Sequence, residues 1–595
     1  MPPGKRQTQS GQRDAAADVS RRDFLRLGAA GAVAASACTA VPWNRGEAGE
    51  DFDHSVDVVA VGGGAAGPVA ALVAARRGAS VLLLEKSPIF GGTAAKSGGV
   101  YWVPNNRFER ERGDLEPRAT TLRNMSRASY PHLFDPEANR FGLPEREFSL
   151  IEAFYDNAWR AVEELEAMEA LHSMPADVMV GPLPDYWDTR EQAGHVVDRR
   201  LWPRKPDGSF GLGGEMVRQL RTGLEAAGVP ILTGHRVEKL LSNARNQVVG
   251  LEARKSDGTR LRVRARKGVV FGTGGFTHNP ELVLLHQPGP VFGGCAVISN
   301  EGDFVYMAQA LGARLGHMGS AWRAQIVLDQ ALQFPSTPDD VFMPPGDSML
   351  LVNQYAERVV NEKTNYNERT RVHYVWDTHR HEWPNLLLFM IYDRRTAELY
   401  GGRFPLPPAG TGAPYVIRGD DLDALAAAID ARLEAYGAKA GRVRLEKSFA
   451  ARLAATIERF DRFAGEGIDA DFRRGQRLYD REWHSKIWSF PNAGSDWPLD
   501  APNPTLHAFE PEGPYYCIIL APGTLDTNGG PLVDARAQVV DAAGLPIPGL
   551  YGAGNCIASP TGAAYYAGGG TLGPLLAFAY LAGVGAAAEP VKELV

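Results

Sequence analysis

The pattern of apolar and polar positions predicts an α/β protein. Residues 56–61 (VDVVAV) and 81–84 (VLLL) are short apolar runs that predict buried strands, and the alanine-rich stretch between them predicts a helix to about Arg77. Strand, helix and strand in this order form a βαβ unit and therefore a parallel sheet. Residues 229–240 and 247–255 read as further strands, and a hairpin turn follows at Asp257-Gly258.

Three later segments predict helices. Residues 422–436 and 448–464 have the periodicity of amphipathic helices and carry no catalytic signature. Residues 571–588 are mostly apolar and long enough to be considered as a membrane span. Gly573-Pro574 lies inside this segment and no basic cluster follows it, so we expect a buried helix that packs against a cofactor.

The N-terminal segment has the pattern of an export signal. Residues 20–26 read SRRDFLR, an apolar run begins at Leu27, and residues 35–37 (ASA) form a small-residue cleavage site. This pattern predicts a twin-arginine signal over residues 1–40, export by the twin-arginine machinery, and a periplasmic or cell-envelope location. The alternatives are an uncleaved amphipathic tail and a lipid anchor at Cys38, which directly follows the cleavage site.

Composition narrows the class of protein. With 44% hydrophobic and 22% charged residues, the chain of 595 residues is not a disordered protein. The net charge is −7 and there is no long basic block, so nucleic acid is not an expected partner. The four cysteines form no CxxC pair and no Cys/His cluster with zinc spacing, so no metal site is predicted.

A dinucleotide-binding motif follows the first predicted strand. Gly62, Gly64 and Gly67 have GxGxxG spacing at the start of the predicted helix, and Glu85 ends the second strand. The first glycine allows a tight turn, the second lets the backbone approach a pyrophosphate, and the third lets helix and strand pack closely. An acidic residue near this position binds a ribose hydroxyl group.

Further glycine-rich segments favour FAD over NAD. Residues 91–99 would run along the diphosphate, the ribityl chain and the flavin edge, and residues 269–275 and 549–555 are two more strand-to-turn segments. The glycines, 66 in all, cluster in such loops, which suits contacts between backbone and phosphate. The candidate FAD-binding residues are Gly62, Gly64, Ala65, Ala66, Gly67, Glu85, Lys86, Gly91, Gly92, Thr93, Ser97, Gly98, Gly99, Val237, Thr273, Gly274, Gly275, Gly554, Asn555, Thr571 and Leu572.

From about Val56 to Gly583 the chain resembles the flavoproteins related to fumarate reductase and 3-ketosteroid Δ1-dehydrogenase. The resemblance implies a Rossmann-like FAD-binding domain of the glutathione-reductase type with an inserted α+β catalytic domain. We place the two parts of the FAD domain at residues 53–277 and 499–595, and the catalytic domain at 278–498. The resemblance also implies noncovalent FAD, because members that attach FAD do so through a histidine that residues 91–99 lack.

The closing segment, residues 559–574, separates two branches of this family. It holds no arginine, lysine or histidine, so a dicarboxylate would find no cationic partner there. It matches the ketosteroid dehydrogenase pattern Tyr-x-x-x-Gly-x-Thr-x-Gly-Pro at Tyr565, Gly569 and Thr571. The resemblance assigns the Tyr565 hydroxyl and the Gly569 amide to the substrate carbonyl, as in an oxyanion hole. Tyr566 is the alternative one residue later.

Residues 351–366 resemble a second family block, which provides the base. Tyr366 stands four residues after Glu362, where ketosteroid dehydrogenases have a catalytic tyrosine. Arg358 occupies the position of the arginine that fumarate reductases use for proton transfer. The tyrosine that supports the base in the ketosteroid enzymes aligns with Leu122, and Tyr130 is the candidate to replace it.

The resemblance implies an FAD-dependent dehydrogenase that acts on CH–CH groups. It would introduce a C=C bond beside the ketone of a 3-ketosteroid or similar cyclic ketone and pass the electrons to an unidentified acceptor. Two alternatives stay open at this point. One is an exported reductase of an unsaturated acid such as fumarate or urocanate, and the other is a flavin carrier without turnover.

Overall fold

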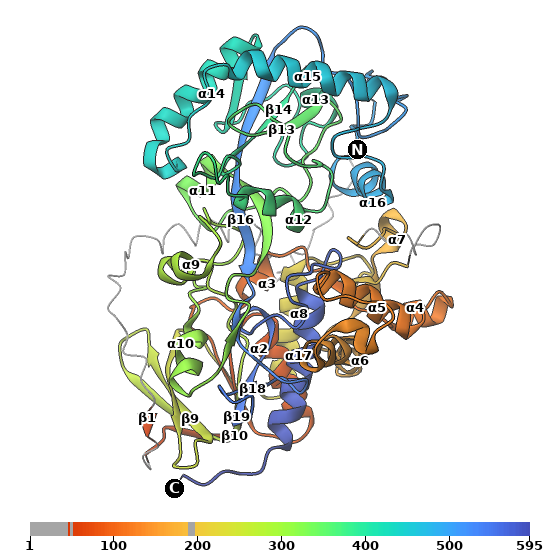
Figure 1. Cartoon of the computed structure of the whole chain (residues 1–595). Coiled ribbons are helices and arrows are strands. Elements are labelled where there is room, and N and C mark those ends of the chain that lie inside the picture. The colour runs from red at the N-terminus through yellow and green to blue at the C-terminus, as the bar shows by residue number, and fades with distance from the viewer. Residues whose placement is uncertain (1–45, 48–50, 188–196, 495, 595) are drawn as a thin grey trace, which may run out of the picture. The chain divides into compact units, whose positions relative to one another are not determined.

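The computed structural model describes residues 46–47, 51–187, 197–494 and 496–594. The predicted export signal at residues 1–40 and Cys38 lie outside the described residues. The described chain carries two large sheets and their covering helices (Figure 1).

In the described part of the chain, the larger sheet has nine strands and a parallel centre. Its central strands are β2 (His54–Val61), β3 (Val81–Leu84), β7 (Ile231–Leu232), β10 (Arg260–Phe271) and β19 (Pro546–Gly552). β2 pairs in parallel with β3 and β10, β3 with β7, and β10 with β19. The carboxyl ends of these strands therefore meet at one edge, where ligands bind in open α/β sheets.

The segment 229–240 is two strands rather than one. Gly234, at φ +69°, separates β7 from β8 (His235–Ser242). β7 pairs in parallel with β3, whereas β8 pairs antiparallel with β9 (Val248–Lys255). Because the two halves join different partners, the chain must turn between them, and glycine adopts the left-handed conformation without strain.

Two helices cover the parallel sheet. α2 (Ala66–Arg76) follows β2, and α17 (Leu572–Ala588) packs against α2 and α6 (Glu145–Ala167). A Cβ at Gly583 would lie 2.6 Å from the Ala70 oxygen, so α2 and α17 approach each other at backbone distance. None of the described helices is long and apolar enough to cross a membrane.

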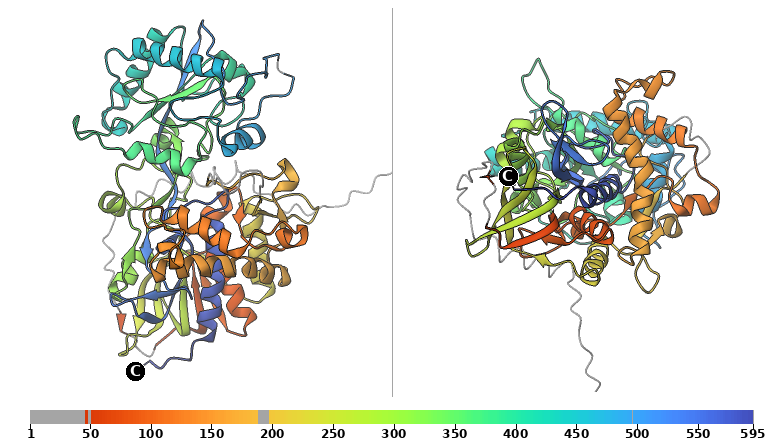
Figure 2. Two further views of the ribbon diagram at one scale, coloured as in Figure 1. Left: turned by 45° about the vertical axis from the view of Figure 1, so that its right-hand side comes forward. Right: turned by 90° about the horizontal axis from the view of Figure 1, so that it is seen from below.

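The second sheet has the order β12–β16–β14–β13, and β15 also pairs with β16. Its strands are β12 (Ala321–Val327), β13 (Met349–Val352), β14 (Leu388–Tyr392), β15 (Val416–Gly419) and β16 (Tyr515–Thr527). β16 thus brings a segment from beyond residue 499 into a sheet whose other strands lie within 278–498. α14 (Leu422–Tyr436) and α15 (Phe449–Glu466) lie beside each other and pack on this sheet (Figure 2).

Shorter elements complete the described chain. The remaining strands are β1 (Gly46–Glu47), β4 (Tyr101–Trp102), β5 (Ser173–Pro175), β6 (Arg200–Pro203), β11 (Leu315–Gly316), β17 (Gly530–Pro531) and β18 (Gln538–Val540). The remaining α-helices are α3 (Gly92–Lys96), α4 (Arg107–Arg112), α5 (Arg118–Ser129), α7 (Asp177–Val180), α8 (Gly213–Ala226), α9 (Pro280–His286), α10 (Asp303–Ala310), α11 (Leu328–Gln333), α12 (Tyr366–Thr370), α13 (Arg394–Leu399) and α16 (Leu478–Trp483).

Gly573→Ala is expected to destabilise the protein. The new Cβ would lie 2.0 Å from the Trp102 oxygen, so β4 and the start of α17 would have to separate, at a cost of about 3 kcal/mol. Gly465→Ala is the matched control, because Gly465 also lies in a helix but faces open space. Thermal unfolding should show a lower Tm for Gly573→Ala only, and equal Tm values for the two variants would contradict this packing.

Candidate active site

The first glycine-rich segment is a tight turn between β2 and α2. A Cβ at Gly62, where φ is +107°, would lie 2.4 Å from the Gly272 oxygen, and one at Gly67 would lie 2.0 Å from the Gly62 oxygen. Neither position has room for a side chain. A Cβ at Gly64 would meet no protein atom within 4 Å, so the backbone there faces open space that a pyrophosphate can approach.

Glu85 stands at the end of β3, beside this turn. Its carboxylate accepts hydrogen bonds of 2.6 Å from the Gly63 and Ser87 amides. Burial raises the pKa of Glu85, although both amides act in the opposite direction. Lys86 is paired elsewhere: its Nζ lies 3.0 Å from Glu301 and 2.9 Å from Asp303. A contact between Lys86 and FAD therefore stays a prediction.

The other predicted FAD segments gather around the same turn. A Cβ at Gly92, at the start of α3, would lie 3.3 Å from the Gly64 Cα, and one at Gly554 would lie 3.5 Å from the Ala66 Cβ. Within the described residues, the buried hydroxyl of Thr273 has no hydrogen-bond partner. Glycines at backbone distance, an open approach at Gly64 and an unsatisfied hydroxyl all suit a bound FAD.

The remaining candidates of these segments occupy the same part of the fold. Ala65 and Val237 are buried, and Thr571 and Leu572 stand at the start of α17. The backbone carbonyls of Ser97 and Gly98 make hydrogen bonds: the Ser97 carbonyl accepts from the Gly213 amide, and the Gly98 carbonyl accepts from the Trp202 indole N–H. Gly91 and Gly99 both adopt positive φ in this loop, at +133° and +74°.

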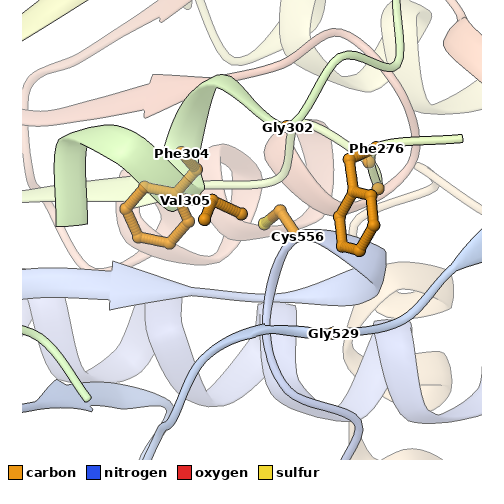
Figure 3. A pocket seen from close by; sticks show the side chains of 8 residues that line it. Phe276, Gly302, Phe304, Val305, Gly529 and Cys556 are labelled. Atoms are coloured by element: carbon orange, nitrogen blue, oxygen red, sulfur yellow. The ribbon is translucent and has the colours of Figure 1, made fainter. Parts of the chain in front are cut away.

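An apolar hollow lies beside the glycine-rich segments 269–275 and 549–555 (Figure 3). It leaves no room for a water molecule, so we assign it to packing and not to ligand binding. Its lining residues are Gly274, Gly275, Phe276, Gly302, Phe304, Val305, Gly529 and Cys556.

The two candidate catalytic tyrosines lie in contact. Tyr366 is the first residue of α12, whose N-terminus is capped by the Asn365 side chain. Tyr565 comes from the turn that precedes α17. The ring centroids are 5.2 Å apart at an interplanar angle of 68°, although 198 positions separate the residues in the sequence. Both side chains are buried.

A third tyrosine, Tyr186, completes this cluster. Its ring centroid lies 5.5 Å from that of Tyr366 and 5.8 Å from that of Tyr565, and it also contacts the rings of Tyr479 and Trp483. The buried hydroxyls of Tyr186 and Tyr479 have no hydrogen-bond partner among the described residues. Two unsatisfied phenols beside Tyr366 and Tyr565 mark a place where a polar ligand atom or water would be accommodated.

Burial controls the acidity of these phenols. It raises the pKa of Tyr366 well above the ordinary value, and the neighbouring Tyr186 and Tyr565 add to the effect. Burial also raises the pKa of Tyr565, whose hydroxyl accepts a 3.3 Å hydrogen bond from the Thr571 hydroxyl. Both side chains are therefore neutral hydrogen-bond donors at neutral pH.

The alternative residues lie elsewhere. Tyr566 has its hydroxyl 2.7 Å from Ser129 Oγ and stacks on Phe154, which places its ring in the core. Tyr130 contacts His317, and Leu122 is a buried core residue. The further tyrosine beside Tyr366 is thus Tyr186, which the sequence reasoning missed, because Tyr186 stands in none of the motifs that carry the family resemblance.

Gly569 satisfies the requirements of an amide donor. It adopts φ +93°, and a Cβ there would lie 2.6 Å from the Trp102 nitrogen, so both conformation and space require glycine. Its carbonyl accepts from the Trp102 amide at 3.1 Å. Its own N–H makes no hydrogen bond to any residue that the structure describes, which leaves this amide available to a ligand.

Arg358 is engaged in a buried ionic network. Its guanidinium donates to both oxygens of Glu362 and of Asp469, at 2.8–3.0 Å. Burial raises the pKa of Glu362, but Arg358 and Arg474 outweigh this effect and the net pKa is lowered. Two carboxylates therefore hold Arg358 as a permanent cation, which does not suit the proton transfer of the reductase alternative.

Four glycine-rich segments around one space and a cluster of phenols define a flavin-dependent oxidoreductase. Residues 57–572 match the protein family described as "FAD binding domain". The chain is 31% identical over 563 residues to 4-oxocyclohexanecarboxylate 2-dehydrogenase of Sinomonas cyclohexanicum, which covers 89% of this chain and 92% of that protein. It is 30% identical over 596 residues to 3-oxosteroid 1-dehydrogenase of Mycobacterium tuberculosis, with 90% and 99% covered.

A solved structure shows the same fold. The 3-ketosteroid Δ1-dehydrogenase of Sterolibacterium denitrificans, in complex with 1,4-androstadiene-3,17-dione, has a TM-score of 0.72 and 25% identity, with 90% of this chain and all of that chain covered. The chain belongs to the FAD-binding flavoprotein family that contains these dehydrogenases. The predictions of this family, of the FAD-binding fold with an inserted domain, of FAD and of an oxidoreductase are confirmed.

Gly64→Ala is expected to give a folded protein that binds FAD poorly. The added methyl group meets no protein atom but enters the space left for the pyrophosphate, so the affinity should fall about tenfold or more, ~1.4 kcal/mol. Circular dichroism checks the fold, and flavin absorbance after dialysis against known FAD concentrations gives the affinity. Gly412→Ala, in an exposed loop with equal space, is the control. Unchanged affinity in Gly64→Ala would refute the assigned position of the pyrophosphate.

Proposed function

We propose that the protein dehydrogenates a 3-ketosteroid or similar cyclic ketone and introduces a C=C bond beside the carbonyl group. The observation that supports this proposal best is the contact between Tyr366 and Tyr565, with the open Gly569 amide four residues after Tyr565. The relatives support it as well, since their names describe dehydrogenases of oxosteroids and of an oxocyclohexane carboxylate.

The chemistry follows from where charge develops. The Tyr565 hydroxyl and the Gly569 amide donate hydrogen bonds to the substrate carbonyl oxygen and stabilise negative charge there. The neighbouring C–H becomes more acidic, and Tyr366 removes that proton. Bound FAD supplies the acceptor for the hydride that leaves the next carbon. The buried surroundings strengthen each of these polar interactions, because water does not screen them.

A tyrosine base needs help in this site. Because burial raises the pKa of Tyr366, its ionised form is scarce at neutral pH. Tyr186 is the phenol next to Tyr366, and its own hydroxyl has no hydrogen-bond partner among the described residues. In the structure as described Tyr186 adds to the raised pKa of Tyr366. In our proposal the Tyr186 hydroxyl rotates to donate to the Tyr366 oxygen as the proton leaves, and it then stabilises the ionised form.

The arginine that stacks on Trp483 does not favour a keto acid over a neutral ketone. Arg200 stacks on Trp483, with the guanidinium carbon 4.9 Å from the ring centroid, and so lies next to the tyrosine cluster. Asp198 already neutralises this cation through hydrogen bonds to Nε and Nη2. A substrate carboxylate would therefore find no uncompensated positive charge on Arg200, whereas a steroid ketone needs none.

The export signal expected over residues 1–40 would place this oxidation outside the cytoplasm. In our proposal the electrons then pass to a separate acceptor.

Tyr366→Phe and Tyr565→Phe should each lower the rate of flavin reduction by about 10²-fold or more, since each removes a group that acts in proton transfer or on the oxyanion. The measurement is anaerobic bleaching of the flavin by androstenedione in a stopped-flow instrument. Tyr566→Phe is the control, because its hydroxyl bonds only to Ser129 in the core and its loss should leave the rate within a few-fold of the original.

Full-speed bleaching in Tyr366→Phe and Tyr565→Phe would reject these roles. Bleaching by 4-oxocyclohexanecarboxylate but not by androstenedione would reject the preference for a neutral ketone. If no ketone bleaches the flavin and the reduced protein is instead reoxidised by fumarate, the reductase alternative is correct.

Tyr186→Phe should shift the pH dependence of flavin reduction. The pKa of Tyr366 is raised, so the rate should increase with pH through the alkaline range as the phenol ionises. Without the Tyr186 hydroxyl, ionisation becomes harder, and the same rate should require a higher pH. Tyr130→Phe is the control, because Tyr130 contacts His317 instead of Tyr366. Superimposable pH profiles for Tyr186→Phe and the original protein would exclude this role.

A further inference from the structure

A buried carboxylate lies where the FAD-binding segments meet. Asp526 is near the end of β16 and its side chain is about 1% exposed. Its Oδ2 accepts hydrogen bonds from the Gly275 amide at 2.8 Å, from Asn300 Nδ2 at 2.6 Å and from Asn555 Nδ2 at 3.4 Å. Its Oδ1 accepts from the Thr277 hydroxyl at 2.9 Å and from the Thr527 amide at 3.0 Å.

These five donors are all uncharged. Among the described residues, no lysine, arginine or histidine forms an ion pair with Asp526. The pKa of Asp526 is raised overall, because burial outweighs the hydrogen bonds from Gly275, Thr277, Asn555 and Asn300, which act in the opposite direction. A carboxylate that accepts so many hydrogen bonds is stabilised in its ionised form. Because both carboxylate oxygens already accept hydrogen bonds, the geometry favours the ionised form, and no cation among the described residues forms an ion pair with it.

Two of the donors to Asp526 connect it to Tyr565 and to the loop around Thr93. Asn555, one of its donors, accepts a 2.9 Å hydrogen bond from the Trp322 indole, and the Trp322 ring lies 5.3 Å from that of Tyr565. Asn300, another donor, also lies 3.3 Å from the Thr93 hydroxyl, in the loop predicted to follow the flavin edge. Asp526 therefore joins two flavin-side segments to the tyrosine that we assign to the substrate carbonyl.

We propose that Asp526 is a positioning residue that holds the Gly275 and Asn555 segments around FAD and, through its charge, lowers the reduction potential of the bound flavin. Reduction adds two electrons to the cofactor. A fixed negative charge opposes this addition most strongly in a poorly solvated interior. The proposal depends on FAD binding alone and not on the identity of the ketone.

Asp526→Asn tests the charge. The substitution keeps the size of the side chain and removes the charge, so the midpoint potential should become more positive. The potential is measured by spectroelectrochemistry without ketone. At the midpoint potential of the original protein, we expect the ratio of reduced to oxidised flavin to rise from one to about ten, which is a shift of about 30 mV for a two-electron couple. An unchanged or more negative potential would overturn the proposal.

Two variants that keep the carboxylate separate charge from loosened packing. Thr277→Val removes one donor from Oδ1, and Asn300→Ala removes the donor with the shortest hydrogen bond to Oδ2. Each leaves the charge less compensated, so at alkaline pH, where Asp526 stays ionised despite the lost donor, the potential should stay constant or become more negative. If these variants shift the potential in the positive direction as Asp526→Asn does, loosened packing explains the effect and the proposal fails. If Asp526→Asn does not retain FAD, the potential of Asn300→Ala decides between the two explanations: a positive shift overturns the proposal, and an unchanged or more negative potential supports it.

Discussion

The site depends on one backbone contact, between strand β4 and the turn that leads into α17. The Gly569 carbonyl accepts from the Trp102 amide at 3.1 Å, and a Cβ at Gly573 would lie 2.0 Å from the Trp102 oxygen. Positions 569 and 573 are one helical turn apart, so both glycines can face the same strand. This contact explains the spacing of the closing motif: the two glycines seat the turn on β4, and the turn then holds Tyr565 opposite Tyr366.

The parts of the fold with local signals were predictable from the sequence. The βαβ unit appears as β2, α2 and β3 within two residues of its predicted limits, and α14 spans the predicted residues 422–436. Long-range pairing had no such signal. β16 lies in the second part of the predicted FAD domain, but its place at the centre of the other sheet depends on partners about 200 residues away.

The candidate site divides in the same way. Tyr366, Tyr565 and Gly569 stand in motifs with fixed spacing, so a family resemblance identifies them. Tyr186 and Asp526 do not belong to any motif that the sequence analysis identified. Tyr186 reaches the cluster because its backbone amide donates to the Tyr566 oxygen at 2.7 Å, and Asp526 reaches the cofactor site through the pairing of β16 with β12. Contacts of this kind follow from tertiary structure, and one sequence contains no pattern for them.

The tyrosine cluster and the glycine-rich segments differ in charge. In the tyrosine cluster, burial keeps the phenols of Tyr366 and Tyr565 neutral, so together with the Gly569 amide they can donate hydrogen bonds without attracting an anion. On the cofactor side stands the carboxylate of Asp526, held by uncharged donors. Trp322 lies between the two, in contact with Tyr565 through its ring and with Asn555 through its indole N–H. A change that moves Trp322 would therefore disturb Tyr565 and the Asn555 donor of Asp526 together, which makes this tryptophan the physical link between the tyrosine cluster and the glycine-rich segments.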